Sequence, residues 1–473
     1  MERLGPVIAT AALPHAAGQI RASREARRVG ADRVEVRIDL LKGAEDPLAL
    51  LGLANEMPLL VSGNRKAADP SEIPVLKAAQ EAGAYVDLSW ADDMPADLWG
   101  LDRTRLVLSF HDFEGMPADL PGILGRMRRV PAAHYKIVPT AGDASDMLAI
   151  KDLLSRNSGI GLAAFAMGAA GAASRVLAPS WGSAATYAAA PGCGAAAPGQ
   201  IPLDALLDLY RIREIRPNTP LYAVAGWPLR WTGSPLLHNR WLAERGLDGC
   251  FLPLPARDWN SVERLLEDLP LEGLAVTIPH KEAAVRFARP GRLAEKIGAA
   301  NTLFRRKRTW RSANTDAYGV RHALRGMAKG TRSLLLGAGG AAAAVAEVLR
   351  GLGPAQCASR DRGRAESLAA RFGLGAVPWQ ERREASWNLL VNATPVGQKG
   401  DGFPVDAGSL RGFAVFDLVV RSGGTPLLRE AAERGLSTIP GEVMLEAQAR
   451  MQFRLFTGIS APGGSLDIFA PLP

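Results

Sequence analysis

Short apolar runs alternate with amphipathic segments through the first 200 residues of the chain. The runs are rich in β-branched residues and predict strands, and the segments between them have the spacing of helices. The predicted strands are 7–10, 33–38, 58–62, 85–88, 105–110, 134–138 and 160–165, with a weaker eighth near 184–189. Strands separated by helices indicate βα units and a parallel sheet, and eight such units fit a (β/α)8 TIM barrel.

A helix predicted at 203–213 closes this region, and the stretch Arg216–Pro220 breaks it. The alternation then starts again. Its predicted elements are a strand at 221–225, a helix at 259–269, a strand at 274–277, a strand at 333–336 and a helix at 341–349. We therefore expect an α/β chain with a domain boundary near the Arg216–Pro220 break.

Charge and hydropathy add little to this picture. A net charge of +8 could indicate a nucleic-acid partner, but the arginines are scattered among acids and there is no basic-aromatic stripe. An attraction for small anions explains the excess better, so we expect no nucleic-acid partner. The apolar stretch 163–173 is short, is broken by glycine and is soon followed by Arg175, so we expect no membrane partner.

The cysteines and histidines indicate the redox compartment of the protein and whether it binds a metal. Cys193, Cys250 and Cys357 are too widely spaced for a disulfide framework or a zinc site, and the six histidines form no ligand cluster. We therefore expect a reducing, cytoplasmic location and no metal. A signal peptide at the N-terminus is possible on composition, but Val7–Thr10 reads better as the first strand.

Polar side chains lie near the carboxyl ends of predicted barrel strands, where barrel chemistry is found: Glu35, Arg37, His111 and Lys136. A lysine amine forms an iminium with a ketone and so acidifies the neighbouring C–H, whose proton a histidine can then move. The alternative is a lysine that extends to solvent and a hydrogen-bonded core histidine. On these residues alone the two interpretations are equally favoured.

A second lysine lies in the run Val276–Glu282, followed by Asn314-Thr315-Asp316. Lys281 and Asp316 could relay a proton to a ketone that receives a hydride. Taken alone, Lys281 reads better as an exposed residue at a helix start. A glycine-rich loop then joins the strand at 333–336 to the next helix, a context that favours pyrophosphate binding: Gly337, Ala338, Gly339, Gly340 and Ala341.

Residues 4–202 carry an ordered set of motifs: 34–39, 108–113, 135–137, 167–168, 174–175, 182–187 and 197–200. With these motifs the region resembles type I 3-dehydroquinate dehydratase, a barrel enzyme of the shikimate pathway. The resemblance implies that Lys136 forms a Schiff base and that His111 is the general acid and base. It also implies a set of substrate-binding residues: Glu35, Arg37, Arg65, Arg175 and Gln200.

Two positions depart from the pattern of that family. Arg65 and Asp69 stand for its arginine and glutamate only if one residue is inserted, and Asp69 would then orient His111. Ala196 replaces a serine of the lid over the site. The loss of one hydroxyl contact costs about 1 kcal/mol, so we expect weakened rather than abolished activity.

Residues 221–473 carry a second ordered set of motifs: 226–228, 234–239, 276–282, 298–303, 314–319, 392–397, 425–428 and 441–449. With these motifs the region resembles shikimate dehydrogenase. The resemblance implies that Lys281 and Asp316 are catalytic, and that substrate is bound by Thr232, Ser234, Thr277, Asn301 and Gln448. The implied parts are a barrel at 1–214 and a dehydrogenase at 219–473, made of an α/β substrate lobe (221–320), a Rossmann NADP-binding lobe (330–440) and C-terminal helices that return to the substrate lobe (441–473).

The implied cofactor is NADP. Where an NAD enzyme has an acidic residue for the ribose, this chain has an arginine-rich stretch, and guanidinium groups pair well with the 2′-phosphate. Asp361 would favour NAD unless its side chain points to solvent. The alternative to cofactor binding is that this stretch is only a solvated run of charges at the start of a helix. Besides the glycine loop, the expected cofactor-binding residues are Ser359, Arg360, Arg364, Thr394, Gly441 and Met444.

We therefore expect a bifunctional enzyme that dehydrates 3-dehydroquinate and then reduces the product to shikimate with NADPH. One alternative is a second domain that prefers quinate, because Thr232, Ala275 and Val420 depart from the family's usual serine, asparagine and tyrosine. Another is a metabolite-sensing regulator without catalysis.

Overall fold

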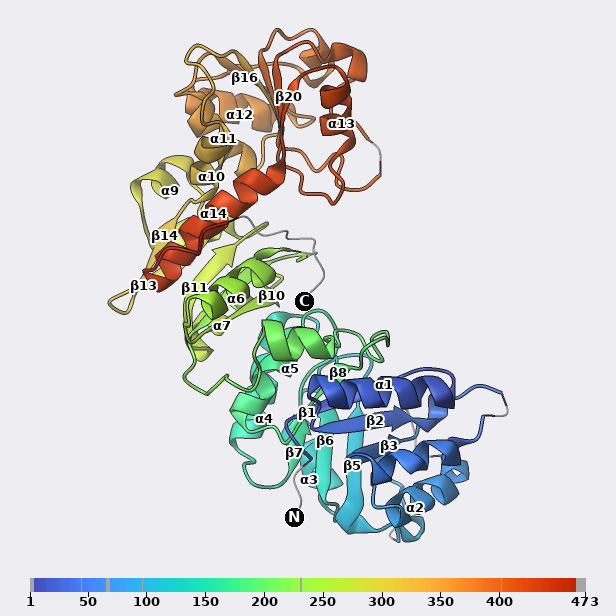
Figure 1. The fold of residues 1–473 in the computed structure, drawn as a ribbon. Helices are drawn as coiled ribbons and strands as arrows, with labels where there is room; N and C mark the ends of the chain where they lie inside the picture. Colours follow the sequence, from blue (N-terminus) through green and yellow to red (C-terminus); the bar gives the residue numbers. More distant parts are fainter. Residues whose placement is uncertain are drawn as a thin grey trace.

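The computed structural model describes residues 4–43, 45–64, 69–95, 97–229, 232–400 and 402–464. Three β-sheets follow one another along the chain, each with its own helices (Figure 1). None of the helices in these ranges is both long and apolar enough to cross a bilayer.

The first sheet has eight parallel strands in the order β7-β6-β5-β4-β3-β2-β1-β8. Between its end strands, Ala184 N donates to Leu162 O at 2.7 Å, so the sheet curls into a near-complete barrel. Each strand overlaps a predicted one, and the predicted fold class is confirmed. The strands are β1 (Val7–Ala11), β2 (Arg33–Arg37), β3 (Leu59–Ser62), β4 (Tyr85–Ser89), β5 (Leu106–His111), β6 (His134–Val138), β7 (Leu162–Ala164) and β8 (Thr186–Ala189).

Helices cover the outer face of the barrel, which is why its strands are apolar on both sides. They are α1 (Ala16–Val29), α2 (Ile73–Glu81), α3 (Leu120–Met127), α4 (Met147–Ser155) and α5 (Ala172–Leu177). The helix predicted at 203–213 is wrong in extent, because the observed π-helical turn is Ala205–Leu209. Arg211 has a φ of 50° and its guanidinium donates to Leu247 O and Gly249 O, so the chain turns there toward the second sheet.

The second sheet has the order β10-β9-β11-β13-β14-β12. Its strands are β9 (Leu221–Gly226), β10 (Cys250–Pro255), β11 (Leu271–Val276), β12 (Arg289–Pro290), β13 (Thr302–Arg306) and β14 (Thr309–Ala313). Its helices are α6 (Ser234–Glu244), α7 (Trp259–Asp268), α8 (Lys281–Phe287), α9 (Arg292–Ile297) and α10 (Asp316–Ala323).

The third sheet is parallel, with the order β17-β16-β15-β18-β19-β20 that is typical of dinucleotide-binding folds. Its strands are β15 (Ser333–Leu336), β16 (Ala355–Ala358), β17 (Gly375–Ala376), β18 (Leu389–Asn392), β19 (Ala414–Asp417) and β20 (Ser437–Ile439). Its helices are α11 (Gly340–Leu349), α12 (Arg362–Phe372) and α13 (Pro426–Glu433). The last helix, α14 (Gly441–Thr457), runs back to the second sheet (Figure 1), where Gln452 Nε2 donates to Asn301 O at 3.1 Å.

The barrel and the second sheet share apolar packing. One continuous cluster of buried side chains runs from Met147 of α4 and Val176 of α5 to Leu252 of β10 and Leu266 of α7. Polar contacts between α7 and the segment before α4 add to it. These two parts of the chain are therefore packed together rather than merely tethered.

His238 of α6 is a neutral histidine in the apolar core of the second sheet. It is 1 % exposed, and its ring stacks on Phe251 at 4.3 Å between centroids. Burial lowers the pKa of His238 to about 3. Below about pH 6.5 the imidazole of His238 therefore binds a proton in the unfolded chain but not in the folded chain. The free energy of unfolding falls as the pH drops.

We expect His238→Phe to reduce this acid sensitivity. Between pH 6.5 and pH 5 the wild type should lose about 2 kcal/mol of stability through this group, and the variant should not. Urea unfolding at several pH values measures the difference. Parallel pH profiles for the two proteins would show that His238 titrates normally.

Candidate active sites

The amine of Lys136 is buried inside the barrel. Lys136 lies on β6 and is 1 % exposed. Its Nζ donates to Asp87 Oδ2 at 2.8 Å, lies 3.9 Å from Glu35 Oε1 and sits 4.2 Å from the centre of the Tyr187 ring. Lys136 is therefore an interior lysine held by two acids, not one that extends to solvent.

Glu35 is fixed by hydroxyl groups from the neighbouring strands. Its carboxylate accepts from Thr10 Oγ1 at 2.6 Å and from Ser62 Oγ at 2.8 Å. Gln200 Nε2 donates in turn to Thr10 Oγ1 at 3.2 Å. These hydrogen bonds link the segment that carries Gln200 to β1 and β2 of the barrel.

A cavity of about 10 Å³ joins the predicted groups of the first site. Such a volume holds about one water molecule, so a larger ligand requires some of the lining side chains to move. Arg175 is 2 % exposed, and its guanidinium lies 4.6 Å from the centre of the Phe165 ring. The lining residues are His111, Lys136, Val138, Phe165, Met167, Arg175, Tyr187, Ala197 and Gln200.

Other predicted residues of this site have other surroundings. Arg37 makes two bonds to Asp39, at 2.8 and 2.5 Å. Arg65 lies outside the described residues. Asp69 accepts from Ser71 N and Oγ and begins the turn η3 (Pro70–Glu72).

Glu72 is the carboxylate of this segment that lies against the end of β3. Its Oε2 accepts from Asn64 N at 3.0 Å. Burial raises the pKa of Glu72, which Asp39 raises further and Arg37 lowers. Glu72, rather than Asp69, is therefore the carboxylate of this segment that contacts the chain just after β3.

Asp87 is a site residue that the sequence reasoning missed. It lies on β4, is 5 % exposed and is the hydrogen-bond partner of Lys136. The signal was available, because a charged residue inside the apolar run Tyr85–Leu88 is as costly as Glu35 in its strand. Only the register of the sheet shows that the two acids face one lysine.

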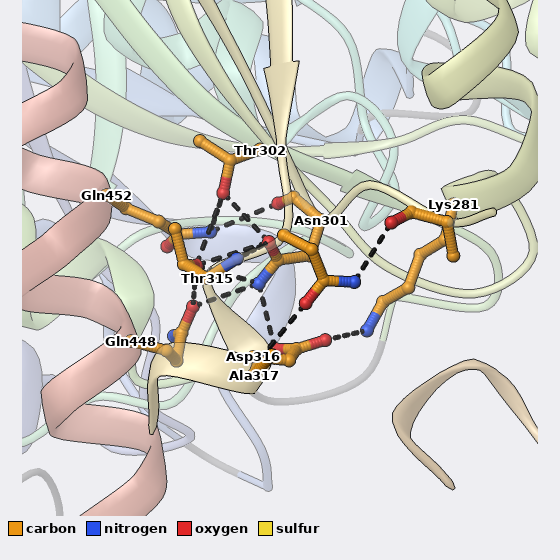
Figure 2. Close-up of polar contacts among 10 residues, drawn as sticks. Lys281, Asn301, Thr302, Thr315, Asp316, Ala317, Gln448 and Gln452 are labelled. Carbon is orange, nitrogen blue, oxygen red and sulfur yellow. Dashed lines mark hydrogen bonds and ion pairs between the residues drawn. The ribbon is translucent and has the colours of Figure 1, made fainter. Parts of the chain in front are cut away.

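The second lysine also meets a carboxylate. Lys281 begins α8 and Asp316 begins α10, and Lys281 Nζ lies 2.5 Å from Asp316 Oδ2 (Figure 2). The side chains are 14 % and 10 % exposed, so the pair is partly shielded but can reach a ligand. Such a pair can deliver a proton to a carbonyl oxygen.

Asn301 organises the polar groups around this pair (Figure 2). Its Nδ2 donates to Asp316 Oδ1 at 2.8 Å and to Thr315 Oγ1 at 2.9 Å. Thr315 Oγ1 donates to Gln448 Oε1 at 3.1 Å, which ties α14 to the site. The prediction had placed Asn301 and Gln448 in one site, and the fold brings them together.

Thr232, Ser234 and Thr277, the other residues predicted to bind substrate in this region, lie in the segments that follow β9 and β11. Thr232 Oγ1 donates to Ser234 Oγ at 3.2 Å just before α6. Thr277 follows β11, and its methyl group packs so closely on Gly226 that a Cβ there would lie 2.3 Å away. That close approach fixes the end of β9 beside Thr277.

The glycine loop of the third sheet reaches the lysine of the second. Gly337 has a φ of 110°, which a side chain would strain. A Cβ on Gly340 would lie 3.4 Å from Lys281 Cδ. This loop and the start of α11 would hold the pyrophosphate of a dinucleotide through backbone N–H groups, and α11 begins beside Lys281.

Two family models match successive regions of the chain. The family model "Type I 3-dehydroquinase" matches residues 9–217, and "Shikimate dehydrogenase substrate binding domain" matches residues 224–303. A chloroplastic bifunctional 3-dehydroquinate dehydratase/shikimate dehydrogenase of Arabidopsis thaliana is 30% identical over 93% of this chain and 79% of its own length. The chain belongs to this bifunctional family.

Single-function relatives match the second region alone. The shikimate dehydrogenase (NADP(+)) of Methanocella arvoryzae is 38% identical over 51% of this chain and 94% of its own length. Among solved structures, the shikimate 5-dehydrogenase of Thermus thermophilus in complex with NADP(H) and shikimate is 37% identical. It covers 51% of this chain and 95% of its own, with a TM-score of 0.48.

In the dehydrogenase region the arginine-rich stretch follows β16. Asp361 is the N-cap of α12, where its Oδ1 accepts from Arg364 N at 3.0 Å. Its Oδ2 lies 3.2 Å from Arg364 Nε, and both side chains are exposed. Asp361 thus has a capping role, and Arg360 is exposed beside it.

The other predicted cofactor residues lie around the same lobe. Thr394 Oγ1 donates to Asn392 Oδ1 at 2.6 Å just after β18. Gly441 begins α14 and leaves room for Leu418 O, which would lie 2.7 Å from an added Cβ. Met444 is 8 % exposed in the cluster between α10 and α11.

Proposed function

We propose that the chain converts 3-dehydroquinate to 3-dehydroshikimate in the barrel and reduces that product to shikimate with NADPH in the second region. The observation that carries the proposal is a shielded lysine on an acidic partner in each region. The Arabidopsis relative, whose name gives both activities, supports the pairing.

In the barrel, the amine of Lys136 adds to the ketone and water leaves, which forms an iminium. Neutral His111 removes a proton from the carbon beside the iminium and returns it to the departing hydroxyl group, which leaves as water. Hydrolysis then releases the conjugated ketone and restores the amine. Asp87 and Glu35, at 2.8 and 3.9 Å from Nζ, hold the amine in place between these steps. Arg175 and Gln200 border the cavity and would bind the carboxylate and hydroxyl groups.

In the second region, bound NADPH supplies a hydride. Lys281 hydrogen-bonds the ketone oxygen of the substrate and gives it a proton as the hydride arrives. Asp316 orients the lysine, and Asn301 keeps Asp316 in place. The resemblance implies that Thr232, Ser234, Thr277 and Gln448 hold the substrate. Gln448 is linked to Asp316 through Thr315 and Asn301.

One coupled assay tests the proposal. Purified protein given 3-dehydroquinate alone should form the absorbance of the conjugated ketone, and added NADPH should then be oxidised. Formation of the conjugated ketone without oxidation would contradict the second half of the proposal. The absence of both signals would favour a metabolite-sensing protein.

The NADP preference is expected to depend on Arg360 and Arg364. Charge-assisted bonds to the 2′-phosphate contribute roughly 1.5–3 kcal/mol each, so the wild type should prefer NADPH to NADH at least about tenfold. Arg360→Ala should lower kcat/KM for NADPH and leave that for NADH unchanged. Steady-state kinetics with both cofactors measures this, and Arg362→Ala is a matched control because Arg362 pairs with Glu366. Equal use of both cofactors by the wild type would assign the ribose to Asp361.

A preference for quinate is the second candidate. Ala275 and Val420 both lie in the apolar cluster beside α14, where the family's asparagine and tyrosine would offer polar groups. Oxidation rates with shikimate and quinate decide between the two substrates. We also propose a cytoplasmic location, because the three cysteines are free thiols.

A further inference from the structure

Arg257 lies between the barrel and the dehydrogenase region. It follows β10, and its backbone N donates to Asp143 Oδ2 at 2.6 Å. Its Nε donates to Gly142 O at 2.8 Å, and its guanidinium lies 4.7 Å from the centre of the Trp227 ring. One side chain therefore contacts a loop of the dehydratase and a tryptophan of the dehydrogenase.

The barrel loop that receives Arg257 is the one that follows the Lys136 strand, and it is held firmly. Thr140 Oγ1 donates to Asp112 O at 2.8 Å, next to His111, and Ala141 N donates to Met167 O at 3.0 Å. Asp143 and Asp146 form a capping box over the turn η6 (Ala144–Asp146). The acceptors of Arg257 thus lie on a loop that is hydrogen-bonded to segments bordering the first site.

On the other side, Trp227 is hydrogen-bonded to the segment that carries Thr277 and Lys281. Trp227 N donates to Ile278 O at 2.8 Å, and Gly226 packs against Thr277. Ala256 O, just before Arg257, lies 2.8 Å from His280 Nε2, and Lys281 is the next residue. Both neighbours of Arg257 therefore lead directly to the segment Thr277–Lys281.

We infer that Arg257 is a positioning residue for the dehydrogenase, and that the dehydratase loop holds it in place. It touches no reacting atom in this arrangement. It braces the Trp227 turn, and with it the threonine and the lysine that meet the substrate. The barrel thereby contributes to substrate binding in the other active site. This inference rests on the proposed dehydrogenase activity.

The test is the split between KM and kcat for shikimate oxidation by the full chain. Arg257→Ala should raise the KM for shikimate roughly three- to tenfold, a modest effect because the side chain is exposed, and should leave dehydratase kinetics unchanged. Arg257→Lys should recover part of the loss, since its amine can still reach Gly142 O. Loss of folded protein alone would lower the apparent kcat and leave KM unchanged.

Two further variants separate positioning from general weakening of the interface. Asp143→Asn can keep the cap on Ser145 N but presents an amide N–H to Arg257 N, so this change in the barrel should raise the dehydrogenase KM in the same direction. Arg257 N is still present in Arg257→Ala, so the two changes combined should raise KM further than either change alone. Lys151→Ala is the matched control, because it removes another bond across the interface, from Lys151 to Asp268 O, away from Trp227. Its KM should match that of the wild type.

An unchanged KM in Arg257→Ala, or an equal rise in Lys151→Ala, would overturn the inference. Failure of the proposed function looks different, because the unaltered protein would then oxidise no shikimate at all.

Discussion

Lys136→Ala is expected to reduce dehydratase activity by at least about 10³-fold, while reduction of supplied 3-dehydroshikimate continues. The barrel reaction depends on a covalent bond that an alanine cannot form. The second active site lies on another sheet, so its kinetics should stay close to those of the wild type. Separate assays of the two half-reactions measure both effects.

Borohydride gives this prediction its chemical test. Reduction of the iminium in the presence of 3-dehydroquinate should add the ligand irreversibly to Lys136, and mass spectrometry of a digest locates the adduct. Lys151→Ala serves as the control, because it keeps the barrel amine and should be trapped like the wild type. An adduct on another lysine, or activity that survives Lys136→Ala, would refute the assignment.

Lys281→Ala should give the complementary result, with dehydrogenase kcat lowered by roughly 10²–10⁴-fold and formation of the conjugated ketone unaffected. The substituted protein loses both the proton donor and the cation that faces Asp316. Its NADPH affinity should change little, because backbone N–H groups of the glycine loop and of the start of α11, rather than Lys281, would hold the pyrophosphate.

Asp316→Asn offers a milder version of this test. It keeps a hydrogen-bonding group near Lys281 and Asn301 but removes the charge, so it should lower kcat and leave KM within a few-fold. Loss of both activities from either change, in protein that remains folded, would contradict two separate catalytic centres.

Much of the fold could be predicted from local pattern because buried parallel strands are continuous apolar runs. The strand predicted at 134–138 is the observed β6, and the strand at 333–336 is β15. Lys136 stood out for the same reason, since a charge within such a run is costly. Lys281, taken alone, read better as an exposed residue at a helix start. Their identification as catalytic depended on family motifs and not on spacing.

Contacts between distant segments were beyond the reach of local pattern. Asp87 meets Lys136 only because β4 and β6 face one interior, and nothing in the run 216–220 predicts how Arg211 turns the chain. The hydrogen bond from Asn64 N to Glu72 was likewise outside any local pattern. Nothing in the local sequence pattern singled out Arg257.

The apolar cluster that crosses from the barrel to the second sheet bears on how this chain can be divided. A cut at 216–220 would separate Met147 and Val176 from Leu252 and Leu266, and each half would present to water a face that the other half now covers. Exposing one such side chain costs about 1.5–3 kcal/mol, so two or three of them equal a large share of a domain's stability. Each enzyme in this chain therefore covers apolar side chains of the other. Cutting the chain at 216–220 should lower the stability of both halves.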